Sequence, residues 1–217
     1  CIYFFEIFLH SKKIYMIFEN ELIPGVLIKR YKRFFVDIKV QNKVITAHCP
    51  NTGSMMGLLK KGNKVWFTKT NDIKRKLKYT LQIIEVERQK IGINTHLTNK
   101  IFYEALLKGN IINLKKTDVL FREKKFNQKT RFDFFIKNKD KGIFIEVKNV
   151  TLSRHKGIAE FPDTITERGL KHVSELLEAK NKGFDVYLVF IIQREDCKKF
   201  KIAEDIDPKY KNLLTFA

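Results

Sequence analysis

The sequence is poor in cysteine, and its three cysteines are far apart. Cys1, Cys49 and Cys197 form no CxxC pair, and an odd number cannot all be paired within the chain. Such a set provides no disulfide framework, so a reducing, cytoplasmic setting is expected. Cys49 follows His48, but an isolated His-Cys dipeptide lacks the ligand spacing of a zinc site. The sequence therefore supports neither a disulfide-stabilised scaffold nor a zinc finger.

Long hydrophobic runs are also missing. The apolar stretch at residues 1–10 contains Glu6, has no basic residues before it and is too short to cross a bilayer. We expect Met16 to be the true start, which makes residues 1–15 an upstream or non-native extension. The sequence contains no GxGxxG, Walker, GxSxG or HExxH motif, so the enzyme classes that carry these motifs are not supported.

Acidic residues are scarce relative to basic ones. The 217-residue chain has 43 Lys and Arg against 24 Asp and Glu, a formal net charge of +19. A field of that sign attracts polyanions, of which nucleic acid is the commonest, although many basic proteins bind none and codon usage can also raise the Lys content. Residues 1–92 are the more basic part, with 18 basic and 7 acidic side chains. We expect nucleic acid as the partner and no membrane association.

Apolar residues are plentiful enough to fill a core, since 44% of the chain is hydrophobic and 12% aromatic. Residues 22–92 contain several short β-rich runs separated by turns, and the last of them predicts one long strand from Tyr79 to Ile93. The pattern favours a small β-barrel or open sheet over residues 16–93, and a five-stranded oligonucleotide-binding barrel fits the size.

From residue 94 the pattern changes to helices and strands in the order αβββαβ. The expected elements are a helix at 97–108 capped by Thr98, strands at 119–126, 132–136 and 143–150, a helix from a Thr164–Glu167 capping box to about 180, and a strand at 184–192. Ile165 is expected on the inner face of the second helix. The chain is thus predicted to be α+β with two domains, the second at residues 94–217.

Two acids lie inside the apolar strands of a predicted hairpin at residues 131–151. Asp133 and Glu146 each have apolar neighbours on both sides. A carboxylate in a β core costs several kcal/mol unless it is paired or holds a metal. Glu146 and Lys148 are two apart and project from the same face of their strand. If the hairpin pairs as its turn suggests, Asp133 lies beside them.

This set of side chains suits metal-dependent phosphodiester hydrolysis. Mg²⁺ or Mn²⁺ binds carboxylate oxygens such as those of Asp133 and Glu146, stabilises developing charge and acidifies water. Lys148 would polarise the water or support the phosphate. The plainer alternative is an ion pair between Glu146 and Lys148 at a sheet edge, because Asp-x12-Glu-x-Lys is a degenerate spacing.

Other polar residues are weaker candidates for the same site. Glu104 is a further metal or water ligand from the first helix, or else a solvated residue at the edge of that helix. Gln193 ends the last buried strand and would either enter the site or be structural. Arg168 and His172 are four apart on the second helix, where they would meet phosphate or form a solvated face.

Basic residues and aromatic residues occur together twice in the first domain. The two clusters are Lys29, Arg30, Lys32 and Arg33 around Tyr31, and Arg75, Lys76 and Lys78 before Tyr79. Proteins that bind single strands combine charge on the backbone with a ring under a base. The alternative is a set of exposed edge lysines, which also discourage aggregation.

Several stretches resemble, in the same order, the sugar fermentation stimulation protein A family over about residues 20–215. They are Leu22-Ile-Pro-Gly-Val-Leu-Ile-Lys-Arg-Tyr-Lys-Arg-Phe34, His48-Cys-Pro-Asn-Thr-Gly-Ser-Met55, Arg75-Lys-Leu-Lys-Tyr-Thr80, Gly92-Ile-Asn-Thr95, Arg131-Phe-Asp133, Glu146-Val-Lys148, Phe161-Pro-Asp163 and Thr166-Glu-Arg-Gly169. The resemblance implies an N-terminal OB-fold, a C-terminal PD-(D/E)XK nuclease-like domain, nonspecific DNA binding, and a regulatory role in bacterial sugar (maltose) metabolism.

Carried over by position, the nuclease-like motif falls on Asp133, Glu146 and Lys148, and Glu104 takes the first-helix acid position. Phe132 stands where the motif name has proline, and residues 1–15 fall outside the family pattern. Two hypotheses follow: a DNA-binding protein with a metal-dependent nuclease-type site, or a non-enzymatic DNA-binding regulator that keeps the nuclease fold as a relic. The oligomeric state stays open, a homodimer included.

Overall fold

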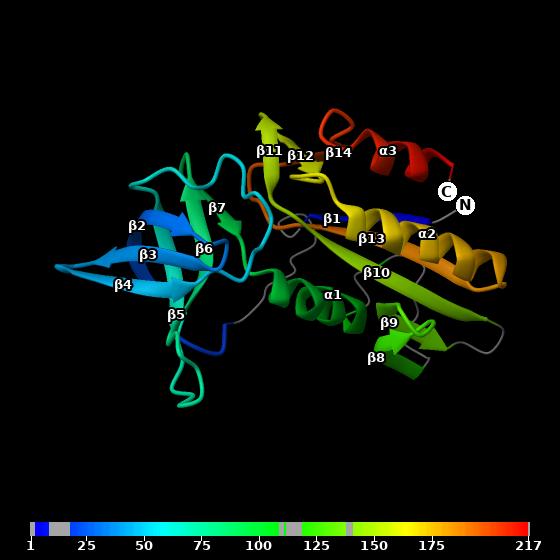
Figure 1. Cartoon of the computed structure of the whole chain (residues 1–217), viewed down its shortest axis with the longest axis horizontal. Coiled ribbons are helices and arrows are strands. Elements are labelled where there is room, and N and C mark those ends of the chain that lie inside the picture. The colour runs from blue at the N-terminus through cyan, green and yellow to red at the C-terminus, as the bar shows by residue number, and fades with distance from the viewer. Residues whose placement is uncertain (1–2, 9–17, 109–110, 112–118, 138–140, 217) are drawn as a thin grey trace.

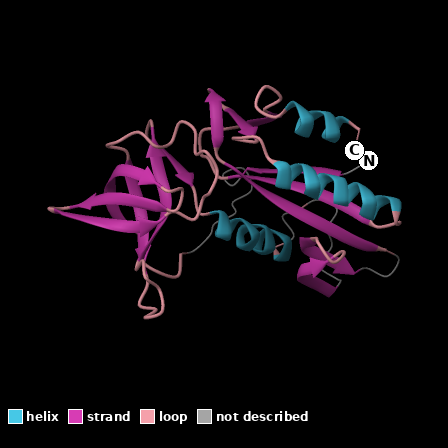
Figure 2. Ribbon diagram, viewed as in Figure 1, coloured by secondary structure: helices cyan, strands magenta, loops and turns pink. Residues whose placement is uncertain are grey.

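The structure is a computed structural model that describes residues 3–8, 18–108, 111, 119–137 and 141–216. The chain folds into two domains, a β-barrel and a layered domain in which helices cover a sheet (Figures 1 and 2). The predicted fold class, α+β with two domains, is confirmed. No helix in the described ranges is long and apolar enough to cross a membrane.

The N-terminal domain is a closed barrel. Its strands are β2 (Ile23–Tyr31), β3 (Phe35–Val40), β4 (Lys43–His48), β5 (Lys64–Lys69), β6 (Tyr79–Val86) and β7 (Gln89–Gly92). They pair in the order β4-β3-β2-β5-β6-β7, and a bridge from His48 to Thr80 joins β4 to β6 and closes the sheet. Alternate side chains such as Leu27, Val36 and Phe67 fill its interior. The predicted oligonucleotide-binding type of barrel is confirmed.

The single long strand predicted from Tyr79 to Ile93 is wrong. The segment is a hairpin of β6 and β7 joined by Glu87 and Arg88, in which Val86 pairs with Gln89. Both turn residues have left-handed backbones, with φ of 52° and 65°. Of the two common two-residue hairpin turns, type I′ needs this conformation at both positions, and Asn and Gly usually supply it. Glu-Arg gives no such signal, so the turn is not visible in the sequence.

The C-terminal domain has the predicted αβββαβ order. Its main elements are α1 (Thr98–Leu107), β8 (Val119–Lys125), β9 (Arg131–Lys137), β10 (Gly142–Val150), α2 (Glu167–Asn181) and β13 (Asp185–Ile192). β8, β9 and β10 are antiparallel neighbours, and β13 runs parallel to β10. A short 3-10 turn, η1 (Thr95–Leu97), precedes α1. Beside the main sheet lie β11 (Leu152–His155), β12 (Ile158–Phe161), β14 (Lys199–Ile202) and the final helix α3 (Pro208–Thr215).

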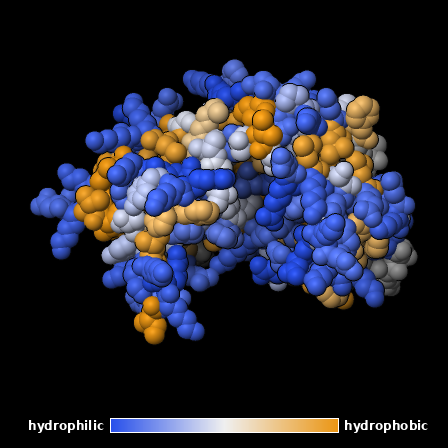
Figure 3. All heavy atoms as spheres, in the orientation of Figure 1, coloured by the Kyte–Doolittle hydropathy of each residue, from blue (hydrophilic) through white to orange (hydrophobic). Residues whose placement is uncertain are grey.

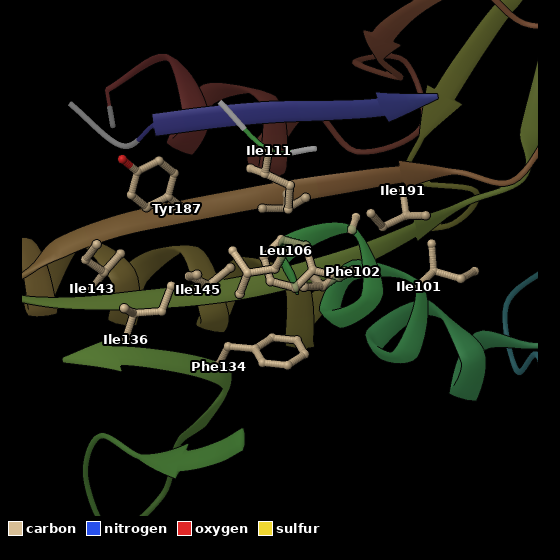
Figure 4. Packing of buried hydrophobic residues seen from close by; sticks show 13 residues of the cluster. Ile101, Phe102, Leu106, Ile111, Phe134, Ile136, Ile143, Ile145, Tyr187 and Ile191 are labelled. Atoms are coloured by element: carbon tan, nitrogen blue, oxygen red, sulfur yellow. The ribbon is translucent and has the colours of Figure 1, made fainter. Parts of the chain in front are cut away.

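Each face of the central strand β10 packs against a different helix. Ile143, Ile145 and Val147 belong to a cluster that includes Phe102 and Leu106 of α1. Figure 4 shows Ile145, Phe102 and Leu106 meeting between helix and sheet. Phe144 and Val150 belong to the cluster under α2. The alternation places the two helices on opposite faces of the sheet.

The first strand in the chain lies at the edge of this sheet. β1 (Tyr3–Phe8) runs parallel to β13, in register from Tyr3 opposite Tyr187 to Phe8 opposite Ile192, and lies beside it in Figure 4. Part of the segment expected to be an extension thus contributes backbone pairing to the C-terminal sheet. Met16, the expected start, lies outside the described residues.

Both helix starts differ in detail from their predictions. The N-cap of α1 is Leu97, without a side-chain cap, and the Thr98 hydroxyl instead contacts the Asn149 Oδ1, 3.2 Å away. α2 is capped by Thr166, whose hydroxyl accepts from the Gly169 amide at 3.0 Å, and not by Thr164. Ile165 precedes the helix and is 69% exposed, so its predicted inner position is wrong.

The two domains contact each other through backbone and polar groups. The Gly92 amide donates to the Gln193 carbonyl at 2.9 Å, which links β7 to the end of β13. On the other side, Asp163 receives hydrogen bonds from the Ser54 hydroxyl and the Met55 amide at 2.7 and 3.0 Å. The face of the molecule seen in Figure 3 is mostly hydrophilic, with its apolar groups separated from one another.

Candidate functional site

Asp133 is fixed at the point where β9 and β10 separate. The two strands pair from Lys137 opposite Gly142 to Phe134 opposite Ile145. The next residue of β9, Asp133, accepts the Val147 amide on Oδ2 at 2.8 Å, so its carboxylate replaces a backbone partner of β10. Its Oδ1 accepts from the Asn99 side chain of α1, also at 2.8 Å. Two independent elements therefore hold this carboxylate in place.

Glu146 lies on the other face of β10, under α2. It is 4% exposed. Its Oε1 contacts the Lys148 Nζ at 2.7 Å and, still more closely, the Nδ1 of His172 from α2. The Lys148 Nζ lies 3.3 Å from the same His172 nitrogen. The strand thus projects Glu146 and Lys148 from one face, as predicted, and α2 adds a histidine to them.

The two carboxylates influence each other electrostatically. Burial, followed by the negative charge of Glu146, raises the pKa of Asp133 from 3.8 to about 7. Burial also works to raise the pKa of Glu146, but Lys148 and His172 outweigh it and hold that pKa below its ordinary value. Around neutral pH the site therefore has one firmly ionised carboxylate beside one that readily takes up a proton.

Two buried oxygen atoms at this site have no hydrogen-bond partner in the described part of the chain. They are Glu146 Oε2 and the hydroxyl of Tyr210 from α3. Burial, and then the charge of Glu146, raises the pKa of Tyr210, which indicates that the two residues are neighbours. An unpaired carboxylate oxygen in the interior is unfavourable unless a cation or another donor satisfies it. The donors here are hard oxygens, which fit Mg²⁺ or Mn²⁺.

The residues present are enough for a sparse metal site and no more. Asp133 and Glu146 are the carboxylates that would contact the ion, and Mg²⁺ commonly keeps several waters beside one or two carboxylates. Within the ranges that the structure describes, no group of three or more His, Cys, Asp and Glu side chains could hold a metal ion.

Glu104 and Gln193 have different surroundings from Asp133 and Glu146. Glu104 lies half-buried on α1, and in the described residues no hydrogen bond or ion pair joins it to either carboxylate. Gln193 is buried and contacts Asn149 Oδ1 at 2.5 Å and Thr98 Oγ1 at 3.3 Å through its Nε2. This polar chain ties the end of β13 to the start of α1, which is a structural role.

Asn99 is a site residue that the sequence did not indicate, and His172 was only a weaker candidate from the sequence. A polar residue in the first turn of α1 gives no signal of its own, since only the fold brings Asn99 to Asp133. Sequence spacing suggested that Arg168 and His172 would meet phosphate or form a solvated face. The solvated face is wrong for His172, which is 8% exposed, whereas Arg168 is exposed.

The first basic cluster of the barrel holds a loop as well as facing solvent. Arg30 donates to the Asn51 and Gly53 carbonyls at 2.8 and 3.1 Å, and Arg33 donates to the Thr52 carbonyl at 2.9 Å. These bonds hold the loop that reaches Asp163 of the other domain. In the same cluster Lys32 is exposed, and Lys29 lies 3.9 Å from Asp37 and over the Tyr31 ring.

In the second basic cluster, too, some of the basic side chains bind the protein's own atoms while another is exposed. Arg75 donates to the Thr80 hydroxyl at 3.0 Å, and Lys78 donates to the Asp72 carbonyl at 2.8 Å. Lys76 between them is exposed. Exposed cations suitable for nucleic-acid phosphates are therefore fewer than the sequence suggests, because several of the predicted residues also bind the protein's own carbonyls and hydroxyls.

Comparison with known proteins finds relatives over nearly the whole chain. Two family models match, the SfsA N-terminal OB domain at residues 28–93 and the sugar fermentation stimulation protein RE domain at residues 96–217. The chain is 51% identical over 195 residues to a sugar fermentation stimulation protein homolog of Pelagibacter ubique, covering 90% of this chain and 84% of that protein. A homolog of Sinorhizobium medicae is 41% identical over 197 residues, covering 90% and 82%.

A solved structure is similar as well. It is described as the structure of Pyrococcus furiosus SfsA in complex with Ca²⁺, and it matches with a TM-score of 0.83 and 27% identity. The match covers 92% of this chain and 84% of that one.

Proposed function

Because the chain belongs to the sugar fermentation stimulation protein family, we propose that it is a DNA-binding protein whose C-terminal domain holds a metal-dependent site for phosphodiester hydrolysis. The observation that carries the proposal is the buried Oε2 of Glu146, which has no hydrogen-bond partner among the described residues, in a site where Asp133 supplies a second carboxylate. The partner is DNA, recognised mainly through its backbone, and the cofactor is Mg²⁺ or Mn²⁺.

Hard divalent cations share a preference for oxygen ligands, so a relative described as a Ca²⁺ complex supports the binding of a divalent cation by this chain. Asp133 and Glu146 would hold the ion. Bound there, the ion would supply charge stabilisation and a more acidic water.

Asn99 and the Val147 amide fix the Asp133 carboxylate, and His172 fixes Oε1 of Glu146, so that Oε2 is left for a cation. Lys148 is the cation placed to meet a phosphate. Its Nζ lies 2.7 Å from Glu146 Oε1, which holds it in position, and the Lys148 side chain is 12% exposed, so part of it is open to solvent. In such an arrangement a lysine stabilises charge that develops on phosphate oxygens.

The close ion pair of Lys148 and Glu146 also favours a second candidate function, a DNA-binding regulator without hydrolytic activity. In this ion pair the ammonium of Lys148 and the carboxylate of Glu146 neutralise each other without any substrate. It leaves Oε2 unexplained, which is why we prefer the hydrolytic proposal.

A cleavage assay distinguishes the hydrolytic proposal from the regulator without hydrolytic activity. Wild type, Asp133→Ala and Lys148→Ala would be incubated with single- and double-stranded DNA and with RNA, in Mg²⁺, Mn²⁺ or a chelator. Glu204→Gln and Lys209→Ala are matched controls, because both residues are exposed and lie on or near α3. We expect metal-dependent cleavage by wild type and controls and a loss of about a hundredfold or more in both site variants.

Absence of cleavage by wild type in any metal, or equal cleavage by the site variants, contradicts the hydrolytic proposal. DNA binding without cleavage would then support the regulator.

A further inference from the structure

A second concave site lies at the edge of the C-terminal sheet. It has a volume of about 600 Å³ and is bordered by β8, β9, β10 and the segment that leads from α2 into β13. This volume is in the range of pockets that hold small organic ligands. None of the residues assigned to the metal site lines it.

Phenylalanine side chains form the inner wall of this pocket. Phe144 is nearly buried at its centre, and its ring centroid lies 4.6 Å from that of Phe135, 5.0 Å from that of Phe184 and 5.4 Å from that of Phe126. The three outer rings are only partly buried. A glycine permits this packing, since a Cβ on Gly142 would lie 2.4 Å from Cζ of Phe135.

Lysine side chains line the rim at both ends. Lys125 lies opposite Arg131 at one end of the β8–β9 pair, and Lys137 lies opposite Val119 at the other. Lys124, Lys141 and Lys182 also line the pocket. Lys182 pairs with an acid of its own helix, since its Nζ lies 2.5 Å from Oε1 of Glu178. The rim therefore has a strong positive charge around an aromatic wall.

A plainer explanation of the lysines is protection of a sheet edge. β8 is an edge strand, and charged side chains discourage pairing with other molecules. Lys182 also covers the Phe126 ring, with Nζ 4.9 Å from its centroid. Edge protection needs charge along β8 alone, however. It does not account for lysines from β9, from the turn before β10 and from the end of α2 around the same rings.

We propose that this pocket binds an unpaired base of a nucleic-acid strand against the phenylalanine wall, with flanking phosphates at the lysines of the two ends. Aromatic side chains in a basic groove are the features that single-strand binders use. Cations at both ends favour a strand, with phosphates on either side of the base, over a free nucleotide. The proposal rests on the proposed function for its ligand class, but it is independent of the metal and of hydrolysis.

Fluorescence anisotropy with a labelled DNA strand of about 12 nucleotides, a length typical of single-strand sites, tests the proposal. The pocket variant is Lys125→Glu/Lys137→Glu. Its control, Lys156→Glu/Lys209→Glu, makes the same change in net charge at exposed lysines elsewhere in the domain. At about 50 mM salt we expect the pocket variant to bind about tenfold or more weakly than the control, since two phosphate contacts are lost.

A second probe, a DNA strand without bases, separates the contribution of base stacking to the affinity from the contribution of the phosphate charges. Wild type should prefer the base-containing strand, and Phe184→Leu, which keeps apolar bulk but removes a ring, should lose most of that preference. Equal affinity of the two double variants, or no preference of wild type for bases, would overturn the proposal. Competition by AMP that disappears in the pocket variant would assign the pocket to a free nucleotide and overturn the strand assignment.

These outcomes are separable from failure of the proposed function. If wild type binds no nucleic acid, both proposals fail. If it binds the strand and the pocket variant binds equally well, the pocket assignment alone fails. If binding depends on the pocket but no metal-dependent cleavage occurs, the hydrolytic function alone fails.

Discussion

Asp133→Asn should stabilise the protein at alkaline pH when no divalent cation is present. The carboxyl group is buried beside Glu146, and its pKa is raised from 3.8 to about 7. Between about pH 4 and pH 7 the folded chain therefore keeps a proton that the unfolded chain releases. The free energy of unfolding must then fall as pH rises through this window, because the folded state binds more protons than the unfolded state. Asn never ionises and avoids this penalty.

The size of the effect follows from the pKa. One pKa unit corresponds to about 1.4 kcal/mol, so a pKa moved from 3.8 to about 7 destabilises the folded state by up to about 4 kcal/mol once Asp133 is ionised. Asn can replace only part of the hydrogen bonding to Asn99 and the Val147 amide, which offsets about 1–2 kcal/mol. We expect a net gain of about 2–3 kcal/mol near pH 8. Near pH 4, where the folded chain keeps Asp133 protonated, only the lost hydrogen bonding remains, so the variant should be less stable than wild type by about 1–2 kcal/mol.

Urea unfolding followed by circular dichroism, in chelator and at a series of pH values, measures this difference. Asp72→Asn is a control at an exposed acid. Added Mg²⁺ should stabilise wild type at pH 8 but not Asp133→Asn. If Asp133→Asn gains no stability at pH 8, or if its difference from wild type does not change with pH, the electrostatic description of the site is wrong.

Two further predictions concern other parts of the molecule. Glu160 is fully buried and paired with Arg154 and Lys201, so Glu160→Gln should lower the free energy of unfolding by about 3 kcal/mol, and a loss under about 1 kcal/mol in urea titrations would contradict this pairing. In the barrel, Lys32→Glu/Lys76→Glu should weaken DNA binding and reduce the slope of log affinity against log salt by about 2, whereas an unchanged slope would remove these lysines from the interface.

The order of elements could be predicted because hydrophobic periodicity records it directly. The continuous apolar run of β13 and the alternation along β10 reflect which faces are buried. The same alternation correctly placed Glu146 and Lys148 on one face. The turn between β6 and β7 was missed because Glu87 and Arg88 adopt a backbone that their side chains do not favour.

The surroundings of the site depended on contacts between distant parts of the chain. His172 reaches Glu146 only because α2 crosses β10 at that point, and Asn99 reaches Asp133 from α1 in the same way. Arg30 and Arg33 looked like free cations, yet much of their hydrogen bonding is used on a loop about twenty residues away. Sequence spacing identifies residue types that suit a reaction, but tertiary packing decides which of them are available.

Binding of Mn²⁺ measured by calorimetry tests the central claim, that Asp133 and Glu146 hold a divalent cation, most directly. Wild type and the exposed-acid control Glu204→Gln should bind one ion with release of protons near pH 7, since Asp133 must ionise to bind it. Glu146→Gln should lose this binding because it replaces the carboxylate whose Oε2 finds no hydrogen-bond partner in the part of the chain that the structure describes. Equal Mn²⁺ binding by wild type and Glu146→Gln, or no binding by wild type, would contradict the claim.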